Sequence, residues 1–271
     1  MDDNNVNCKN KSIRTVLITG ITGTLGSALG EYYRQQGWNV IGVTRKNTDR
    51  LDACDKVVVN LQQSPADAQH LLSFQADLII LNAGAIETAI GPAGEPLSES
   101  IQSLTTVNFM FPALVALEAA ASVQKPLDMI CIGSIADCSP SCFGPVYHAS
   151  KIALHYFIQG TSPILQHANP MIRLRLYRPG VILGPLSWAP INRLNEKGIR
   201  IRSKRCQQAP SASVIARRID QFRCSRKTIA SDRLPLSFRL LKIFFILAPE
   251  LFSRVQRIAW RSASAFVKHS D

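Results

Sequence analysis

The 271-residue sequence lacks the features that mark several specialised classes of protein. No apolar run stands near its N-terminus, so we expect neither a signal peptide nor a membrane anchor there. Residues 1–12 are instead polar and rich in Asn and Lys, which predicts a disordered tail. The sequence also has no internal repeat, no low-complexity tract and no linker in its middle, and its length then predicts one large α/β domain with an ample core.

Cysteine pairs with the spacing of a metal site are also missing. The seven cysteines are odd in number and scattered, and without a secretory signal they predict reduced thiols in a cytoplasmic protein. Cys138 and Cys142 lie close together, but no second pair of Cys or His accompanies them. We therefore expect loop thiols here and no metal site.

Acidic residues are scarce in the last third of the chain. Residues 171–271 carry 21 Lys and Arg against 5 Asp and Glu, whereas residues 1–170 carry 10 against 14. A basic excess favours polyanionic partners such as phosphates, anionic lipid or nucleic acid. Nucleic acid is not expected, because the basic residues are dispersed among helical stretches without aromatic residues between them for base stacking.

Short apolar runs alternate with helical stretches through most of the chain. Each run is continuously hydrophobic, which is typical of a parallel sheet covered by helices on both faces. The sequence therefore predicts a Rossmann-type, doubly wound α/β domain over residues 13–233. The predicted strands are residues 15–19, 38–44, 56–61, 77–81, 127–132 and 171–177, and the predicted helices lie at 28–36, 63–74, 98–122, around Tyr147, and at 211–222.

Two later segments are harder to interpret. Residues 186–208 show no clear period, and we expect a mobile segment that covers the site and sets substrate identity. Residues 234–271 form a basic amphipathic helical tail that Pro249 interrupts. Its densest apolar run, 240–248, is too short to span a bilayer. The helices either pack on the domain, which we favour, or lay a basic face on an anionic membrane.

A glycine-rich turn follows the first apolar run. Gly20, Gly23 and Gly26 stand between that run and a helical stretch. In this order the turn brings backbone N–H groups to a pyrophosphate, and the helix N-terminus favours its negative charge. At the end of the second run stands Arg45 instead of a carboxylate. An arginine there suits a ribose 2′-phosphate, so we expect NADP in preference to NAD.

Polar residues with the chemistry of proton transfer follow. Tyr147 and Lys151 are four residues apart, so a helix places them on one face. A fixed cation beside a phenol lowers its pKa toward the neutral range, where proton transfer is efficient. Asn108 interrupts an apolar helix, which predicts a buried and hydrogen-bonded amide.

As a set, these motifs resemble the short-chain dehydrogenase/reductase family over residues 15–180. The resemblance implies that Tyr147 exchanges a proton with the substrate, that Ser134 orients the reacting oxygen, that Lys151 binds the nicotinamide ribose and tunes the tyrosine, and that Asn108 anchors a water in a proton relay. The motifs are Thr19-Gly20, Gly23, Gly26, Asn82-Ala83-Gly84, Asn108, Ser134, Tyr147, Lys151 and Pro179-Gly180.

The resemblance also implies a cofactor site. Thr24 stands where many compact members have glycine, and Asn60 stands where an aspartate commonly meets the adenine, although an amide can still hydrogen-bond there. The expected cofactor-binding residues are Gly20, Thr22, Gly23, Thr24, Leu25, Gly26, Arg45, Asn60, Leu61, Asn82, Ala83, Gly84, Tyr147, Lys151, Pro179, Gly180 and Val181.

We therefore expect a cytoplasmic NADP(H)-dependent oxidoreductase that reduces a carbonyl or oxidises the matching secondary alcohol of a small molecule. The glycine spacing leaves a nucleotide-sugar epimerase or dehydratase as an alternative, although the roughly 90 residues after the sixth strand are few for its substrate domain. The basic tail leaves another: a cofactor-binding, membrane-docked regulatory protein with peripheral membrane contact. The resemblance also implies a homo-oligomer.

Overall fold

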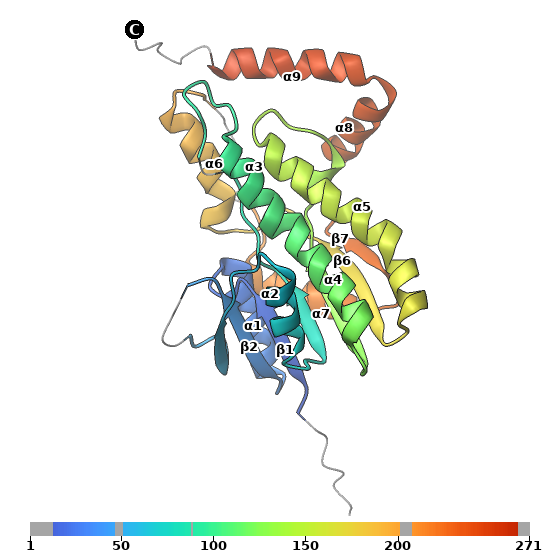
Figure 1. Cartoon of the computed structure of the whole chain (residues 1–271). Helices are drawn as coiled ribbons and strands as arrows, with labels where there is room; N and C mark the ends of the chain where they lie inside the picture. Colours follow the sequence, from blue (N-terminus) through green and yellow to red (C-terminus); the bar gives the residue numbers. More distant parts are fainter. Residues whose placement is uncertain (1–12, 47–50, 88, 201–207, 265–271) are drawn as a thin grey trace, which may run out of the picture.

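A parallel sheet forms the centre of the molecule in the computed structural model, which describes residues 13–46, 51–87, 89–200 and 208–264 (Figure 1). Seven strands pair in the order β3-β2-β1-β4-β5-β6-β7, and every pairing is parallel. The predicted Rossmann-type fold is confirmed. The strands are β1 (Thr15–Thr19), β2 (Asn39–Thr44), β3 (Lys56–Val59), β4 (Leu78–Leu81), β5 (Leu127–Ile132), β6 (Ile172–Arg178) and β7 (Ile229–Ser231).

The strand order reverses between β1 and β4, which places a crevice at the carboxyl ends of these two strands. All four residues of β4 are buried, and in β1 only Thr15 is partly exposed. Full burial explains why both strands appear in the sequence as unbroken apolar runs. The glycine turn after β1 and Asn82-Ala83-Gly84 after β4 therefore lie side by side at the crevice.

Helices cover both faces of the sheet. One apolar core joins the sheet to α2, α4 and α5, and the other joins it to α1 and α7. In Figure 1, α2, α4 and α5 lie in front of the strands. The helices are α1 (Thr24–Gln35), α2 (Pro65–Leu72), α4 (Phe111–Ser122), α5 (Pro145–Ala168) and α7 (Ala212–Arg223).

The predicted helix at 98–122 is divided into α3 (Ser98–Thr105), the π-helical turn η1 (Thr106–Met110) and α4. Pro112 has no N–H to donate, so the regular α-helical bonding pattern cannot continue through it. By length and composition this stretch, alone among the described residues, could cross a membrane, but half of its most apolar window is buried inside the domain. The stretch from α3 to α4 is therefore explained as a pair of helices that pack on the core of the domain.

Three expectations need correction. Residues 186–196, the first part of the irregular mobile segment predicted at 186–208, form a helix with the preceding proline: α6 (Pro185–Glu196) starts at a residue suited to the first turn. Strand β7 was not predicted, because none of its three residues is fully buried and they form no long apolar run. Three predicted strands extend beyond the observed ones by one or two residues, at 38, 60–61 and 77, and the sixth is shifted by one residue. The disordered tail predicted at 1–12 and residues 201–207 lie outside the described residues.

The basic tail forms two helices, as the position of Pro249 predicts. They are α8 (Leu236–Leu247) and α9 (Pro249–Ser264), and Figure 1 shows α9 lying across the end of the molecule, beyond α3, α5 and α6. Phe252 and Ala263 of α9 are buried, whereas α8 contains no buried residue. Packing on the domain, which we favoured, therefore holds for one face of α9, while α8 contacts the 3-10 turn η2 (Ile135–Cys138) without burying any residue completely.

Candidate active site

The glycine turn has the close approaches that a dinucleotide site requires. Gly20 has φ of +67°, and a Cβ there would lie 2.9 Å from Cα of Ala83. A Cβ on Gly26 would lie 2.1 Å from the Gly20 carbonyl oxygen. Side chains are thus excluded from the turn, while Gly23 precedes α1 without a side chain to cap its first N–H groups. These N–H groups fit an anionic pyrophosphate.

Asn82 and Thr19 fix the two strand ends to each other. The Asn82 amide donates to the carbonyl oxygens of Thr19 and Gly20, at 3.0 and 3.3 Å, and the N–H of Ala83 donates to the Thr19 hydroxyl at 2.9 Å. The predicted neighbours Thr22 and Thr24 are exposed beside the turn, whereas Leu25 is buried beneath it. Thr24 is also in contact range of Gly184, whose Cβ would lie 3.0 Å from the Thr24 hydroxyl oxygen, so α6 begins close to the turn.

The residues predicted to contact the adenosine end of a cofactor differ in exposure and in the hydrogen bonds that they already make. Arg45 is exposed directly after β2, and the glycine turn bonds to that strand through the N–H of Gly20 and the Val43 carbonyl at 3.0 Å. Asn60 is buried, donates to the Asp67 carbonyl at 2.9 Å and accepts from the N–H of Gln62 at 2.9 Å. The neighbouring Leu61 is exposed. Arg45 is thus exposed where it can meet a phosphate, while the Asn60 amide is engaged by its own chain.

Asn108 lies in the π-helical turn and is buried, as its sequence context predicts. Its oxygen accepts from the N–H of Ala85 at 2.9 Å, and its amide donates to the Ala85 carbonyl at 2.9 Å and to the Ser150 hydroxyl at 3.0 Å. Ser150 in turn donates to the Tyr147 carbonyl at 2.8 Å. The amide therefore links the segment after β4 to the helix that carries Tyr147.

Tyr147, Ser134 and Lys151 meet at the carboxyl end of β5. The Ser134 side chain lies close enough to the Tyr147 hydroxyl to lower its pKa. The Lys151 ammonium lies 5.9 Å from the centre of the Tyr147 ring and donates to the Ile132 carbonyl at 3.0 Å. A Cβ on Gly84 would lie 3.2 Å from the Asn108 oxygen and 3.5 Å from the Lys151 nitrogen. The structure thus brings the four predicted catalytic side chains to one edge of the sheet.

Burial sets the protonation of this group. It raises the pKa of Tyr147 above its ordinary value of 10.0, and the neighbouring Ser134 opposes this only in part. The expected lowering of the Tyr147 pKa is therefore wrong. Burial also lowers the pKa of Lys151 to about 8. At neutral pH the tyrosine is a protonated donor and the lysine is still largely charged.

Three buried carboxylates that the sequence analysis missed surround the site. Asp137 bonds Arg178 through Nε at 2.7 Å and His155 through Nδ1 at 2.9 Å, which ties the loop after β5 to β6 and α5. Asp232 accepts from the N–H of Gly180 at 2.9 Å and so fixes the predicted segment of Pro179, Gly180 and Val181. Their partners lie far away in the sequence, so no local pattern reveals them.

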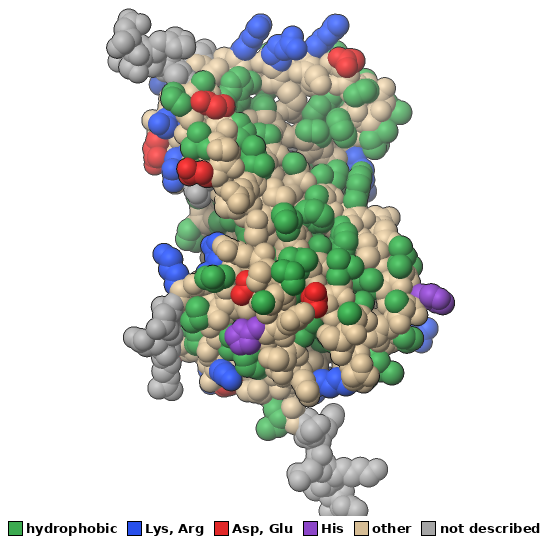
Figure 2. Space-filling view, viewed as in Figure 1, with side chains coloured by type: hydrophobic (Ala, Val, Ile, Leu, Met, Phe, Trp, Pro, Cys, Tyr) green, Lys and Arg blue, Asp and Glu red, His purple; other side chains and the backbone are tan. Residues whose placement is uncertain are grey.

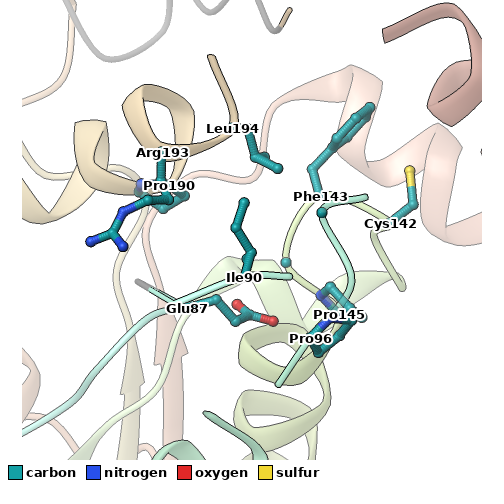
Figure 3. A pocket seen from close by; sticks show the side chains of 11 residues that line it. Glu87, Ile90, Pro96, Cys142, Phe143, Pro145, Pro190, Arg193 and Leu194 are labelled. Carbon is teal, nitrogen blue, oxygen red and sulfur yellow. The ribbon is translucent and has the colours of Figure 1, made fainter. Parts of the chain in front are cut away.

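Glu87 is the third. One carboxylate oxygen accepts from the N–H groups of Val146 and Tyr147, at 2.6 and 3.2 Å, and so caps the N-terminus of α5. The other oxygen is buried without a hydrogen-bond partner among the described residues. Figure 3 shows the carboxylate reaching toward Pro145 at the start of α5. Its position soon after Asn82-Ala83-Gly84 is the one signal in the sequence that suggests it.

A cavity of about 20 Å³ adjoins Glu87, which is room for one water-sized group. Its wall is mostly apolar and comes from the segment before α3, the start of α5, and α6 (Figure 3). Trp260 and Ala263 of α9 pack on the same apolar cluster and so cover this region. The lining includes Ile90, Phe143, Pro190, Arg193 and Leu194.

The chain is similar to known dehydrogenases over most of its length. The sequence profile described as short chain dehydrogenase matches residues 14–191. No curated protein sequence matches the chain at a significant level.

Solved structures of this family share the fold. A short chain dehydrogenase/reductase from Burkholderia phymatum in complex with NAD superimposes with a TM-score of 0.70 at 18% identity, covering 87% of this chain and 95% of that one. A short chain dehydrogenase from Burkholderia cenocepacia in complex with NADP gives 0.66 at 14% identity, covering 90% and 97%. One from Sphingobium yanoikuyae in complex with NADPH gives 0.64 at 18% identity, covering 96% and 98%.

Proposed function

Because the chain belongs to the short-chain dehydrogenase/reductase family of NAD(P)-dependent oxidoreductases, we propose that it reduces a carbonyl group with NADPH and that Tyr147 donates the proton. The observation that carries this proposal is the proximity of Tyr147, Ser134 and Lys151 at the carboxyl end of β5. A phenol and a hydroxyl that lie this close together are placed to contact one substrate oxygen.

The chemistry of each residue follows from its environment. A bound nicotinamide nucleotide supplies the hydride. Negative charge then develops on the carbonyl oxygen, where the Ser134 hydroxyl stabilises it and Tyr147 supplies the proton. Lys151 places a positive charge beside the phenol. Because the raised pKa of Tyr147 keeps its proton in place at neutral pH, we favour reduction over oxidation of the matching secondary alcohol.

The preference for NADPH rests on Arg45. Its exposed guanidinium follows β2 at the side of the glycine turn, where a ribose 2′-phosphate would lie. A guanidinium pairs with phosphate through charge-assisted hydrogen bonds. NAD is the less favoured cofactor, because the two residues described directly after β2, Arg45 and Lys46, are basic and not acidic.

The epimerase or dehydratase alternative has less support. Such an enzyme needs a separate domain for its nucleotide-sugar. After β6 the described chain forms only α6, α7, β7, α8 and α9, of which α7 packs directly on the Rossmann core and α6 on α9.

We place the enzyme in the cytoplasm as a homo-oligomer. Exposed apolar side chains on α4 and α5, among them Leu117, Tyr156 and Ile164, provide an apolar surface through which two copies can pair.

Replacing Tyr147 with Phe tests the proposal. NADPH oxidation would be followed across a panel of aldehydes and ketones, and the turnover of the variant is expected to fall by about 10²- to 10⁴-fold. Tyr156→Phe is the matched control, since Tyr156 lies on the same helix but is exposed. Equal rates for wild type and Tyr147→Phe would reject Tyr147 as the proton donor.

A further inference from the structure

Helix α8 carries an apolar stripe that faces solvent. Leu236, Leu240, Ile243 and Leu247 follow one another at spacings of three and four residues, so they lie along one face of the helix. Each of them is between 51% and 77% exposed. In a helix that packs on a globular domain, a stripe of this kind faces the core. Here it is left without a partner among the described residues.

Two partly buried phenylalanines hold α8 in place. Phe244 and Phe245 pack against Phe252 of α9, with ring centres 5.7 and 5.3 Å apart. Phe252 is buried. The exposed stripe therefore belongs to a fixed helix, and its outward direction follows from Phe245, which lies on the side of the helix opposite the stripe.

Helix α9 is oriented by its own inner face. The Gln256 side chain accepts from the N–H of Cys142 at 2.9 Å, and Trp260 packs on Phe143 with ring centres 5.7 Å apart. Leu251, Val255 and Ile258, at spacings of four and three residues, are exposed on the other side. The apolar surface of α8 thus continues on α9.

Basic side chains border this apolar surface. Figure 2 shows a row of Lys and Arg side chains along the edge formed by α9, next to hydrophobic side chains at the corner with α8. Glu250 is the one acidic residue of the two helices. The basic residues are Arg239 and Lys242 on α8 and Arg254, Arg257 and Arg261 on α9.

We propose that this α8–α9 surface, made of the seven apolar and five basic side chains named above, docks on an anionic lipid bilayer. The apolar side chains would enter the boundary between headgroups and acyl chains, and the basic side chains would meet the lipid phosphates. Both helices are shorter than the ~20 residues that span a bilayer, so the protein lies on the membrane and does not cross it.

The charge of the surface argues against the other occupants. A second copy of the chain would bring its own basic side chains against these, whereas the apolar side chains exposed on α4 and α5 offer a pairing surface without such a row. Nucleic acid would satisfy the basic residues but leave the leucines and isoleucines in water. An anionic bilayer satisfies both kinds of side chain.

Vesicle co-sedimentation of the full-length protein tests the proposal. We expect binding to vesicles of phosphatidylcholine mixed with phosphatidylglycerol, weak binding to phosphatidylcholine alone, and loss of binding as salt is raised, because surface charges are screened. The paired variant Leu240→Gln/Leu247→Gln should abolish binding. The triple variant Arg254→Gln/Arg257→Gln/Arg261→Gln should weaken binding by about 100-fold, because each basic residue near an anionic membrane contributes about 1 kcal/mol to binding.

Matched variants elsewhere provide the controls. Arg226→Gln/Lys227→Gln/Arg233→Gln removes three exposed positive charges outside the surface, and Val214→Gln removes an exposed apolar side chain from α7. Both should bind vesicles as wild type does. Thermal unfolding confirms that every variant is folded.

The proposal is overturned if wild type does not bind anionic vesicles, or if the controls lose binding as much as the α8–α9 variants do. It is also overturned if Leu240→Gln/Leu247→Gln halves the mass in solution while leaving vesicle binding intact, because the surface would then join two copies of the chain. Since no side chain of the surface belongs to the active site, binding and NADPH oxidation can fail independently.

Discussion

The sheet domain and the α8–α9 surface place their apolar residues in opposite ways. Every residue of β4 is buried, whereas no residue of α8 is buried. Carboxylates in the domain pair with arginines, as Asp137 does with Arg178, but α8 and α9 contain five basic residues and one acidic residue. The domain satisfies its side chains internally, and the two helices present theirs outward. This difference separates the part that we expect to perform chemistry from the part that we expect to meet a partner.

The largest expected difference is in stability. Leu78→Ala removes a fully buried side chain from β4 and should lower the free energy of unfolding by about 2–5 kcal/mol. Leu240→Ala truncates the same side chain on α8, where it is exposed, and should change that free energy by about 0.5 kcal/mol or less. Urea denaturation measures both. Equal destabilisation by the two substitutions would show that α8 packs against something in solution.

The arginines of the sheet domain and of the α8–α9 surface should also differ in the ligand that they bind. Arg45→Gln is expected to lower the affinity for NADPH by about 10- to 100-fold, because a charge-assisted hydrogen bond is lost, and to leave NADH affinity unchanged. Cofactor titration by fluorescence measures both affinities. The triple substitution of Arg254, Arg257 and Arg261 should change neither. A loss of NADH affinity in Arg45→Gln would contradict a role in binding the 2′-phosphate.

A smaller effect is expected from Glu87→Gln, which keeps an acceptor for the N–H groups of Val146 and Tyr147 but removes the charge. The free energy of unfolding should fall by about 1 kcal/mol. The negative charge of Glu87 contributes to the raised pKa of Tyr147, so its removal lowers that pKa. The pH above which reduction slows should therefore move down. Glu250→Gln, which removes an exposed carboxylate from α9, is the control and should leave the pH profile unchanged.

The smallest expected effect is a dependence on pH that affects catalysis by the sheet domain but not vesicle binding by the α8–α9 surface. Burial lowers the pKa of Lys151 to about 8, so the ammonium loses its proton as the pH rises above that value. We expect kcat/KM for NADPH, which reports groups of the free enzyme, to fall above pH 8. Vesicle binding should stay constant over the same range, since arginine side chains keep their charge. A flat kcat/KM profile up to pH 9.5 or so would contradict the role of Lys151.

The sequence predicts the domain well because buried parallel strands are continuous apolar runs and because its motifs stand directly at strand ends. Helix α6 was missed because Pro185 and Pro190 suggest an irregular segment, although one lies in its first turn. Glu87, Asp137 and Asp232 were missed because their partners lie between 14 and 60 residues away. Long-range pairs of this kind leave no local pattern.

Two further properties depend on surroundings that no local pattern reveals. The pKa of Tyr147 rises because burial outweighs the effect of the neighbouring Ser134, and the depth of burial follows from the packing of α5 on the sheet. The alternation of apolar and basic residues in α8 is equally compatible with packing or exposure. The contacts of α8 with α9 and with residues 135–138 decide which side of α8 faces outward.

The division between chemistry and docking is tested most directly by measuring NADPH oxidation and vesicle binding on the same preparations of Tyr147→Phe and Leu240→Gln/Leu247→Gln. We expect the first variant to bind anionic vesicles as wild type does but to turn over substrate at least about 100-fold more slowly. The second should oxidise NADPH normally and fail to bind vesicles. If one substitution abolished both NADPH oxidation and vesicle binding, the two functions would not be separate. If neither substitution affected either property, Tyr147 and the α8–α9 surface would not have the roles proposed for them.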